Sequence, residues 1–304
     1  MKNLILILTI LLPLDAISES QIIILQNEKS QKLHGVLDSH NDRRENVVLL
    51  VHGTRGHQKM EIIDSIKSIL SENQIDSLSI NLSYGEELRE NNFFSCDKSH
   101  KHLESSSIDE LLKWYKYLRI QKYSNIYLLG HSRGGLNVLQ LSEIIPHSDI
   151  GHVKGLFLLA PVSDTLDDYI LEYETKGVDL KSKINEMIDR VKTNNNQSNT
   201  IDFLYCNNSS VSDSSFLSYY YLTDSPQSHP YGTDLITLLN RTNFKTYIFM
   251  GSSDELVPLT RNKVEQVKHN NVTSFLIDDA GHFFRDLYMD DVMEVVLDIV
   301  KEGK

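Results

Sequence analysis

Short, continuously apolar runs alternate with longer amphipathic segments from Val47 to the end of the chain. The apolar runs predict strands at 47–53, 75–82, 125–129, 153–161, 245–251 and 272–278. The amphipathic segments predict helices at 59–70, 106–120, 136–145, 261–268 and 286–300. A strand that is apolar along its whole length is buried on both faces, as in a parallel sheet covered by helices. The pattern therefore predicts an α/β fold.

Two further segments precede this alternation. The runs at 21–26 and 32–38 have the length and composition of an antiparallel hairpin, which we expect at the edge of the sheet.

The alternation stops between residues 163 and about 230. Helices are predicted at 166–175 and 179–193, no strand is evident, and an aromatic run "FLSYYYL" occupies 216–222. A long insert of this kind inside a compact domain is usually a lid or a binding element. A variable surface insertion without a role in substrate choice is the alternative. The aromatic run fits either an apolar acyl pocket or a core.

The first 18 residues have the features of a cleaved secretory signal. Lys2 gives a positive start, Leu4 to Leu14 is almost wholly apolar, and Ala16 and Ser18 are small. The run is too short to span a bilayer comfortably, so no membrane span is expected after processing. A retained anchor or a buried first strand is the alternative. We expect a secreted or periplasmic protein whose folded domain spans 19–304.

Composition excludes some partners. The formal net charge is −12, with no dense basic cluster, which argues against binding nucleic acid. Cys96 and Cys206 could pair in an oxidising compartment or remain as thiols. Cys96 lies near His100 and His102, but a tetrahedral zinc site needs a fourth ligand, so neither a metal nor a cofactor is expected. We expect this loop to line the mouth of a pocket. The oligomeric state is left open.

The strongest chemical signal is "GHSRGG", which joins the strand at 125–129 to the next helix. A G-x-S-x-G motif between a strand and a helix is a nucleophile elbow, in which a tight turn exposes the serine. The alternative is a plain strand–helix turn. We predict that Ser132 is the nucleophile.

A serine needs a base, and the base needs an orienting acid. His282 follows the last predicted strand and is the expected base, with His229 as the runner-up. Asp254 follows the preceding strand and is the expected acid, with Asp164 as the rival. The competing interpretations are that His282 is a structural loop residue and that Asp254 only caps a helix.

An oxyanion hole would complete the site. The backbone amides of Thr54, in the loop "HGTRG", and of Arg133, directly after the serine, are the expected donors. His52 is interpreted as a structural residue that ties this loop. The side chains of Arg55 and Arg133 could hold an acidic substrate group, but exposed arginines are more often solvated.

Taken together, "HGTRG", "GHSRGG", "GSSDELVP" and "AGHFF" occur in an order that resembles the α/β-hydrolase superfamily. The resemblance covers most of the chain after residue 18. It implies an eight-stranded, mostly parallel sheet with helices on both faces and a helical lid in the 163–230 insert. It assigns Ser132, Asp254 and His282 to a triad and Thr54 and Arg133 to the oxyanion hole. The segment from Tyr84 to His102 matches no particular subfamily.

We therefore expect a serine hydrolase, similar to carboxylesterases and lipases, that cleaves a small-molecule ester or related acyl bond through an acyl-enzyme. A peptidase or amidase of the same fold is one alternative. A non-catalytic binding protein that keeps the fold is another, although a silent relative would not need all three triad groups.

Overall fold

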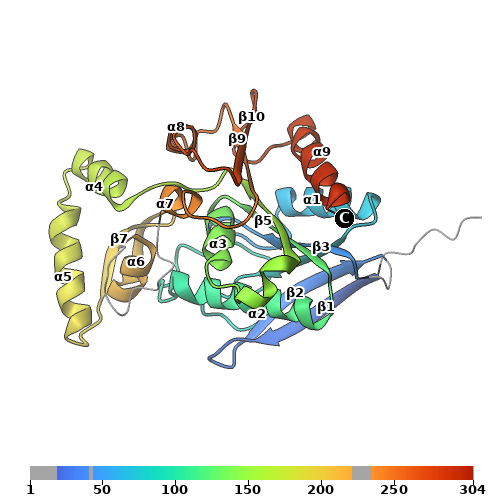
Figure 1. The fold of residues 1–304 in the computed structure, drawn as a ribbon. Helices are drawn as coiled ribbons and strands as arrows, with labels where there is room; N and C mark the ends of the chain where they lie inside the picture. The colour runs from blue at the N-terminus through green and yellow to red at the C-terminus, as the bar shows by residue number, and fades with distance from the viewer. Residues whose placement is uncertain (1–18, 41–43, 221–233, 304) are drawn as a thin grey trace, which may run out of the picture.

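The computed structural model describes residues 19–40, 44–220 and 234–303. Its centre is an eight-stranded sheet with the order β1-β2-β4-β3-β5-β6-β9-β10 (Figure 1). The strands are β1 (Glu19–Gln26), β2 (Lys32–Ser39), β3 (Asn46–Val51), β4 (Asp76–Asn81), β5 (Asn125–His131), β6 (Val153–Leu159), β9 (Thr246–Gly251) and β10 (Val272–Ile277). Strand β2 is antiparallel to β1 and β4, and the other neighbours are parallel. The predicted α/β fold and its N-terminal edge hairpin are confirmed.

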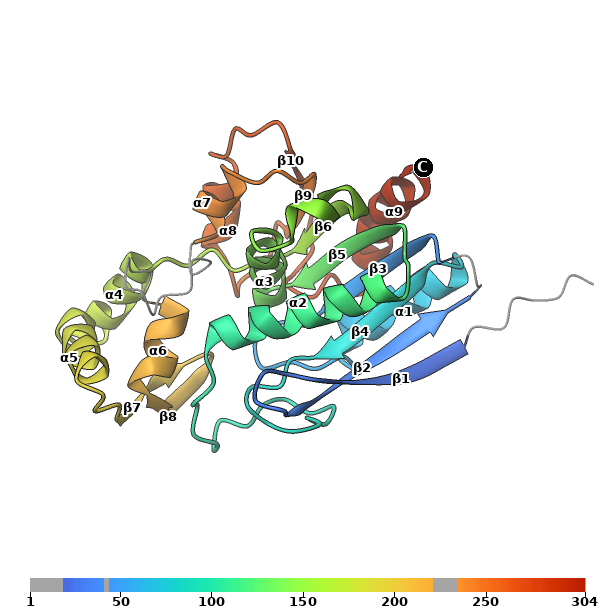
Figure 2. The same cartoon turned by 60° about the horizontal axis from the view of Figure 1, so that its bottom comes forward.

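Helices cover both faces of this sheet. Helices α1 (Glu61–Glu72) and α9 (Leu287–Glu302) lie together on one face, and α2 (Glu104–Ile120) and α3 (Arg133–Ser142) lie together on the other (Figure 2). The shorter helices are η1 (His147–His152), α7 (Leu235–Leu239) and α8 (Leu259–Val264). Over the described part of the chain, no helix is both long enough and apolar enough to cross a bilayer.

The sheet is apolar because both of its faces are buried. Strand β3 is buried from Val47 to Val51, and Leu128 of the neighbouring β5 and Phe157 of the next strand, β6, are fully buried. Burial of continuous apolar strands on both faces is what a parallel sheet requires.

Helices α2 and α3 each begin earlier than predicted. Helix α2 begins at Glu104, not Ser106, and its cap is not a local serine, because the Glu104 amide donates to Ser218 Oγ at 3.1 Å. Helix α3 begins at Arg133, not Leu136, because it includes two glycines that interrupt the apolar helical pattern. Both differences arise from tertiary packing that local sequence patterns do not report.

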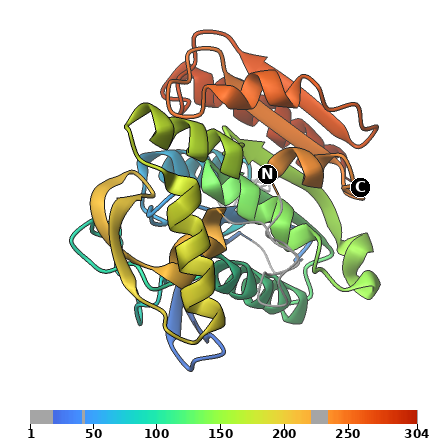
Figure 3. The ribbon, with the colours of Figure 1, turned by 90° about the vertical axis from the view of Figure 1, so that its left-hand side faces the viewer.

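The insert after β6 projects from one side of the sheet (Figures 1 and 3). It contains α4 (Leu166–Thr175), α5 (Leu180–Lys192), β7 (Ser198–Phe203), β8 (Cys206–Ser212) and α6 (Asp213–Tyr220). The prediction that it has no strand was wrong: β7 and β8 form an antiparallel hairpin. Serine and asparagine occupy most positions of β8, so its sequence resembles a loop. That the insert acts as a lid stays a prediction.

The insert has its own hydrophobic cluster, which includes Met187, Phe203, Phe216, Tyr219 and Tyr220. The part of the aromatic run that the structure describes therefore belongs to a core. Residues 221 and 222 of that run, the 1–18 signal prediction and His229 lie outside the described residues.

A disulfide fastens the insert to the main domain. Cys96, between β4 and α2, is bonded to Cys206 at the start of β8, with the two Cα atoms 5.4 Å apart and a sequence separation of 110. Beside it, the His100 amide donates to the Ser210 carbonyl at 2.7 Å, and the Ser212 amide donates to the His100 carbonyl at 2.9 Å. The segment around Cys96 thus pairs with the insert, and the pairing of the cysteines that the sequence left open is settled.

The packing of β6 yields a stability prediction. Phe157 is fully buried and stacks between Tyr127 and Tyr247, with ring centroids 5.9 Å and 5.5 Å away. Truncation leaves a cavity, so Phe157→Ala should lower the free energy of unfolding by about 3–5 kcal/mol. Urea unfolding followed by fluorescence of Trp114, the one tryptophan, measures this. Phe93→Ala, at a side chain 54% exposed, is the control and should change stability little. A loss under about 1 kcal/mol at Phe157 would contradict the packing described.

Candidate active site

Ser132 occupies a strained turn between β5 and α3. Its φ is 56° and its ψ is −122°, a conformation that costs a non-glycine residue about 1–3 kcal/mol. Its amide donates to the Leu159 carbonyl at 2.8 Å, and its carbonyl accepts from the Gly135 amide at 3.0 Å. The strain is therefore held in place by backbone contacts on both sides, which a plain strand–helix turn would not need.

The turn requires glycine at two positions of the motif, because neighbouring backbone atoms occupy the space that a side chain would need. A Cβ on Gly130 would lie 2.1 Å from the Gly134 carbonyl oxygen, and one on Gly134 would lie 2.4 Å from the Val51 carbonyl oxygen. No side chain fits at either position. This crowding presses the turn against the end of β3 and places Ser132 over the N-terminus of α3, where the helix dipole is positive.

His282 and Asp254 lie in contact. His282, in the loop between β10 and α9, has Nδ1 2.8 Å from Asp254 Oδ2, in the loop after β9. The other Asp254 oxygen accepts from the amides of Leu256 at 2.9 Å and Val257 at 3.1 Å. Asp254 thus both caps the following turn and orients the imidazole.

The hydrogen bonds to Asp254 favour its ionised form. Burial alone would raise the pKa of Asp254, but the hydrogen bonds from His282 and from the two amides lower it below its ordinary value. Asp254 is then an ionised acceptor, so Nδ1 of His282 carries a proton towards it, and the neutral form of this ring has its lone pair on Nε2.

The rival acid is placed elsewhere. Asp164 follows β6 at the start of the insert and makes no hydrogen bond to His282. Burial raises the pKa of Asp164, with the charges of Arg133 and Lys263 opposing the rise. Of the two candidate carboxylates, the structure brings Asp254 to the histidine.

His131, which the sequence did not single out, joins the serine turn to the histidine loop. Its Nε2–H donates to the His282 carbonyl at 2.9 Å, and the two rings lie 4.7 Å apart. Burial, and then the nearby His282 ring, lower the pKa of His131 to about 3, so this ring stays neutral. Since His131 directly precedes Ser132, this bond brings the His282 loop against the serine turn. Its place in the motif was the available signal.

The expected oxyanion loop packs on the serine. A Cβ on Gly53 would lie 3.1 Å from Ser132 Cβ, and Thr54 follows directly. His52 ties this loop, as expected: its Nδ1–H donates to the Gly53 carbonyl at 2.9 Å, and its Nε2 accepts from the Leu82 amide at 3.1 Å. Thr54 and Arg133 are therefore neighbours of the serine from two different elements.

Arg89 is buried behind the loop that carries Thr54 and makes several hydrogen bonds there. No sequence pattern indicated this role. Its guanidinium donates to the Leu82 carbonyl at 2.6 Å and the Asn92 carbonyl at 2.7 Å, and also to the Gly56 carbonyl and to His52 Nε2. Burial and the charge of Arg89 lower the pKa of His52 well below its ordinary value. The loop that carries Thr54 is thus held by hydrogen bonds from the charged Arg89 and from the neutral His52.

The expectation of an exposed, solvated side chain at Arg133 was wrong. It is 7% exposed, its Nη1 donates to Glu104 Oε1 at 2.9 Å, and its guanidinium lies 5.2 Å from the Tyr219 ring centre. Burial would lower the pKa of Arg133, but the Glu104 carboxylate raises it. The arginine is therefore a matched charge under the insert, and Glu104 is a site neighbour that no sequence pattern indicated.

Cys96, His100 and His102, which lie close together in the sequence, have structural roles instead of binding zinc. Cys96 is oxidised in the disulfide, which removes the thiolate ligand. His100 Nδ1 lies 3.3 Å from His102 Nε2, and His102 Nδ1 lies 3.0 Å from the Tyr219 hydroxyl. Both histidines are buried under the insert. We expected their loop to line the mouth of a pocket, but the insert covers the part of the loop that holds these two residues.

Four buried neutral histidines make the fold sensitive to acid: His52, His100, His102 and His131. Burial, the largest cause in each, lowers the pKa of His100 to about 4 and those of His102 and His131 to about 3, and it lowers that of His52 well below 6.5. Below pH 6.5 the unfolded chain binds protons that the folded chain does not. Stability should therefore fall as pH drops from about 6.5 towards 4, by about 1.4 kcal/mol per pH unit for each histidine.

Urea unfolding at pH 7, 6 and 5 measures this slope. His100→Phe should reduce the slope by about one histidine's share, because one buried imidazole is removed. His152→Gln, at a partly buried position in η1, is the matched control for removing an imidazole. Equal stability at pH 7 and pH 5 would contradict the assignment.

Comparison with known proteins gives matches by structure only. No family model matches the chain, and no curated protein matches it by sequence. Est1E from Butyrivibrio proteoclasticus is 16% identical, with a TM-score of 0.62, over 92% of this chain and 99% of that one. The Pyrococcus furiosus esterase Pf2001 is 15% identical, with a TM-score of 0.57, over 98% of this chain and 96% of that one. The alpha/beta hydrolase GrgF from Penicillium sp. sh18 is 14% identical, with a TM-score of 0.60, over 94% and 99%. The chain therefore has the α/β-hydrolase fold.

Proposed function

We propose that this protein is a serine hydrolase that cleaves a carboxylic ester or a similar acyl bond. Ser132 is the nucleophile, His282 the base and Asp254 the acid, and the amides of Thr54 and Arg133 stabilise the oxyanion. The observation that carries the proposal is the 2.8 Å contact between His282 and Asp254, held by His131 beside a serine in a strained turn.

The proposed reaction has two halves. His282 Nε2 takes the proton of Ser132 Oγ as the oxygen attacks the acyl carbon, and the carbonyl oxygen becomes an oxyanion that accepts from the two amides. The intermediate collapses, the ester C–O bond breaks, and His282 returns the proton to the leaving alcohol. Water, deprotonated by the same imidazole, then cleaves the acyl-enzyme and regenerates Ser132. Asp254 stays ionised throughout and stabilises the imidazolium.

A second Ser–His–Asp set shows why contacts alone do not assign a nucleophile. Ser71 Oγ lies 2.9 Å from His40 Nε2, and His40 Nδ1 lies 3.3 Å from Asp76 Oδ1. Ser71, however, stands in the last turn of α1, where backbone carbonyls and the negative end of the dipole would repel an oxyanion. Ser132 precedes the first turn of α3, where amides and the positive end favour one. We therefore assign Ser132 and treat the other set as structural.

Two observations support the finer points of the proposal. The Pyrococcus furiosus neighbour Pf2001 is named an esterase, which favours an ester over an amide substrate. The Cys96–Cys206 disulfide favours an oxidising compartment, consistent with the secretion signal expected over 1–18 and with a secreted or periplasmic location.

Replacing the nucleophile is the direct test. Ser132→Ala should lower turnover of p-nitrophenyl acetate by about 10³-fold or more and abolish labelling by a fluorophosphonate probe. Ser71→Ala is the matched control, because it removes a serine that also contacts a histidine, and it should keep turnover and labelling. Activity that survives Ser132→Ala but not Ser71→Ala would move the site to the other end of the sheet, and wild-type activity in both would end the proposal.

The acid is tested in the same assay. Asp254→Asn removes the charge that orients and stabilises the imidazole, so kcat should fall about 10²–10⁴-fold. Asp164→Asn should change kcat by less than about threefold, a change within the range of a residue outside the chemistry. The reverse ranking would assign the acid to the strand before the insert.

A further inference from the structure

Arg55 directly follows the proposed oxyanion donor Thr54 and is held in an unfavourable backbone conformation. Its φ is 54°, in the left-handed region that few residues with side chains adopt. Such a conformation persists only when surrounding contacts hold it. The question is therefore which contacts fix Arg55, and with it the loop that carries the Thr54 amide.

The contacts come from the segment after β4. The Phe94 amide donates to the Arg55 carbonyl at 2.9 Å, and Arg55 Nη1 donates to the Phe94 carbonyl at 3.1 Å. Arg55 is thus held by its main chain and its side chain at the same partner residue.

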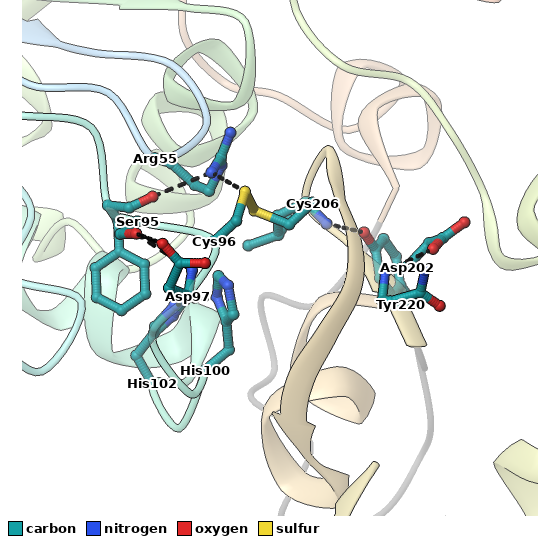
Figure 4. Close-up of a disulfide and its surroundings, with 12 residues drawn as sticks. Arg55, Ser95, Cys96, Asp97, His100, His102, Asp202, Cys206 and Tyr220 are labelled. Atoms are coloured by element: carbon teal, nitrogen blue, oxygen red, sulfur yellow. Dashed lines mark hydrogen bonds between the residues drawn. A yellow bond between two sulfur atoms is a disulfide. The ribbon is translucent and has the colours of Figure 1, made fainter. Parts of the chain in front are cut away.

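The same guanidinium reaches the disulfide. Arg55 Nη1 lies 2.7 Å from Cys96 Sγ, and Figure 4 shows the side chain extended to this sulfur, on the main-domain side of the bond to Cys206. Cys206 begins strand β8 of the insert. One arginine therefore connects the oxyanion loop with the covalent link to the insert.

No ordinary ion pair explains this placement. Among residues 19–40, 44–220 and 234–303, no carboxylate forms a salt bridge with Arg55, and its Nε is buried without a partner. A buried, unpaired donor is a cost that the contacts of Nη1 must offset. The side chain serves the Phe94 carbonyl and the disulfide, and both lie in the segment that pairs with the insert through His100.

We propose that Arg55 is a positioning residue, and that through it the Cys96–Cys206 disulfide sets the oxyanion loop for catalysis. The inference rests on the proposed function. Oxyanion donors act only when they are held within about half an ångström of the productive geometry. A disulfide that fixes Phe94 and Cys96 holds Arg55, and Arg55 holds the loop. Without the disulfide the site should still bind substrate but should stabilise the transition state less well.

The test compares kcat and KM for p-nitrophenyl acetate across three variants. Cys96→Ser with Cys206→Ser should lower kcat about 10-fold, less than the loss of a whole oxyanion donor, with KM changed less than about threefold. Arg55→Met should lower kcat by a similar factor. The triple variant should lose no more than either, because both changes act through one contact chain.

The controls separate positioning from folding. Rates are normalised to active sites titrated with a fluorophosphonate probe, so unfolded protein does not count. Arg241→Met is the matched arginine variant, since Arg241 pairs with Glu143 at 2.9 Å away from the triad loops, and it should leave kcat unchanged. If the double serine variant does not fold, reduction of the folded wild-type protein with dithiothreitol gives the same comparison.

Three results would overturn the inference: an unchanged kcat per active site in the disulfide variant, an unchanged kcat in Arg55→Met, or losses that multiply in the triple variant. Failure of the proposed function is distinguishable, because turnover would then survive Ser132→Ala.

Discussion

The backbone of Ser132 is the constraint on which the site depends. A φ of 56° at a residue with a side chain is unfavourable, and it persists here because the turn is enclosed by the ends of three strands. Leu159 of β6 accepts from the serine amide, and the Val51 carbonyl of β3 lies where a side chain on Gly134 would be. Relaxing the turn would require moving the central strands of the sheet.

This enclosure explains why the core and the chemistry cannot be separated. Strands β3, β5 and β6 are buried on both faces, so their carboxyl ends are fixed relative to one another. The loops that leave β9 and β10 bring Asp254 and His282 to the same edge, where ligands bind in open α/β sheets. A rigid sheet thus supplies the positional precision that acyl transfer demands, while loops supply the groups.

Behind the site, polar groups are buried in matched sets. Glu104 compensates Arg133, and His52, Leu82, Asn92 and Gly56 accept from Arg89. The nearby histidines His52 and His102 stay neutral because burial disfavours the charged imidazolium, and the charge of Arg89 disfavours it further. These networks fix the loops around the serine and tie the insert to them.

The sequence by itself determined the features that have a local signature. Continuous apolar runs indicated the parallel strands, "GHSRGG" marked the serine turn, and the carboxyl ends of later strands pointed to Asp254 and His282. These inferences need only short-range periodicity and the rule that parallel strands end at a common edge.

Only the tertiary structure decided which distant residues meet. Glu104 pairs with Arg133 across 29 residues, and Cys96 with Cys206 across 110. The β7–β8 hairpin forms although β8 consists mostly of residues typical of loops. Ser218 of the insert caps α2 by accepting from the Glu104 amide. Such contacts join residues that are separated by long stretches of chain. Neither secondary-structure propensity nor motif spacing indicates which distant residues will meet, because both describe only neighbouring positions.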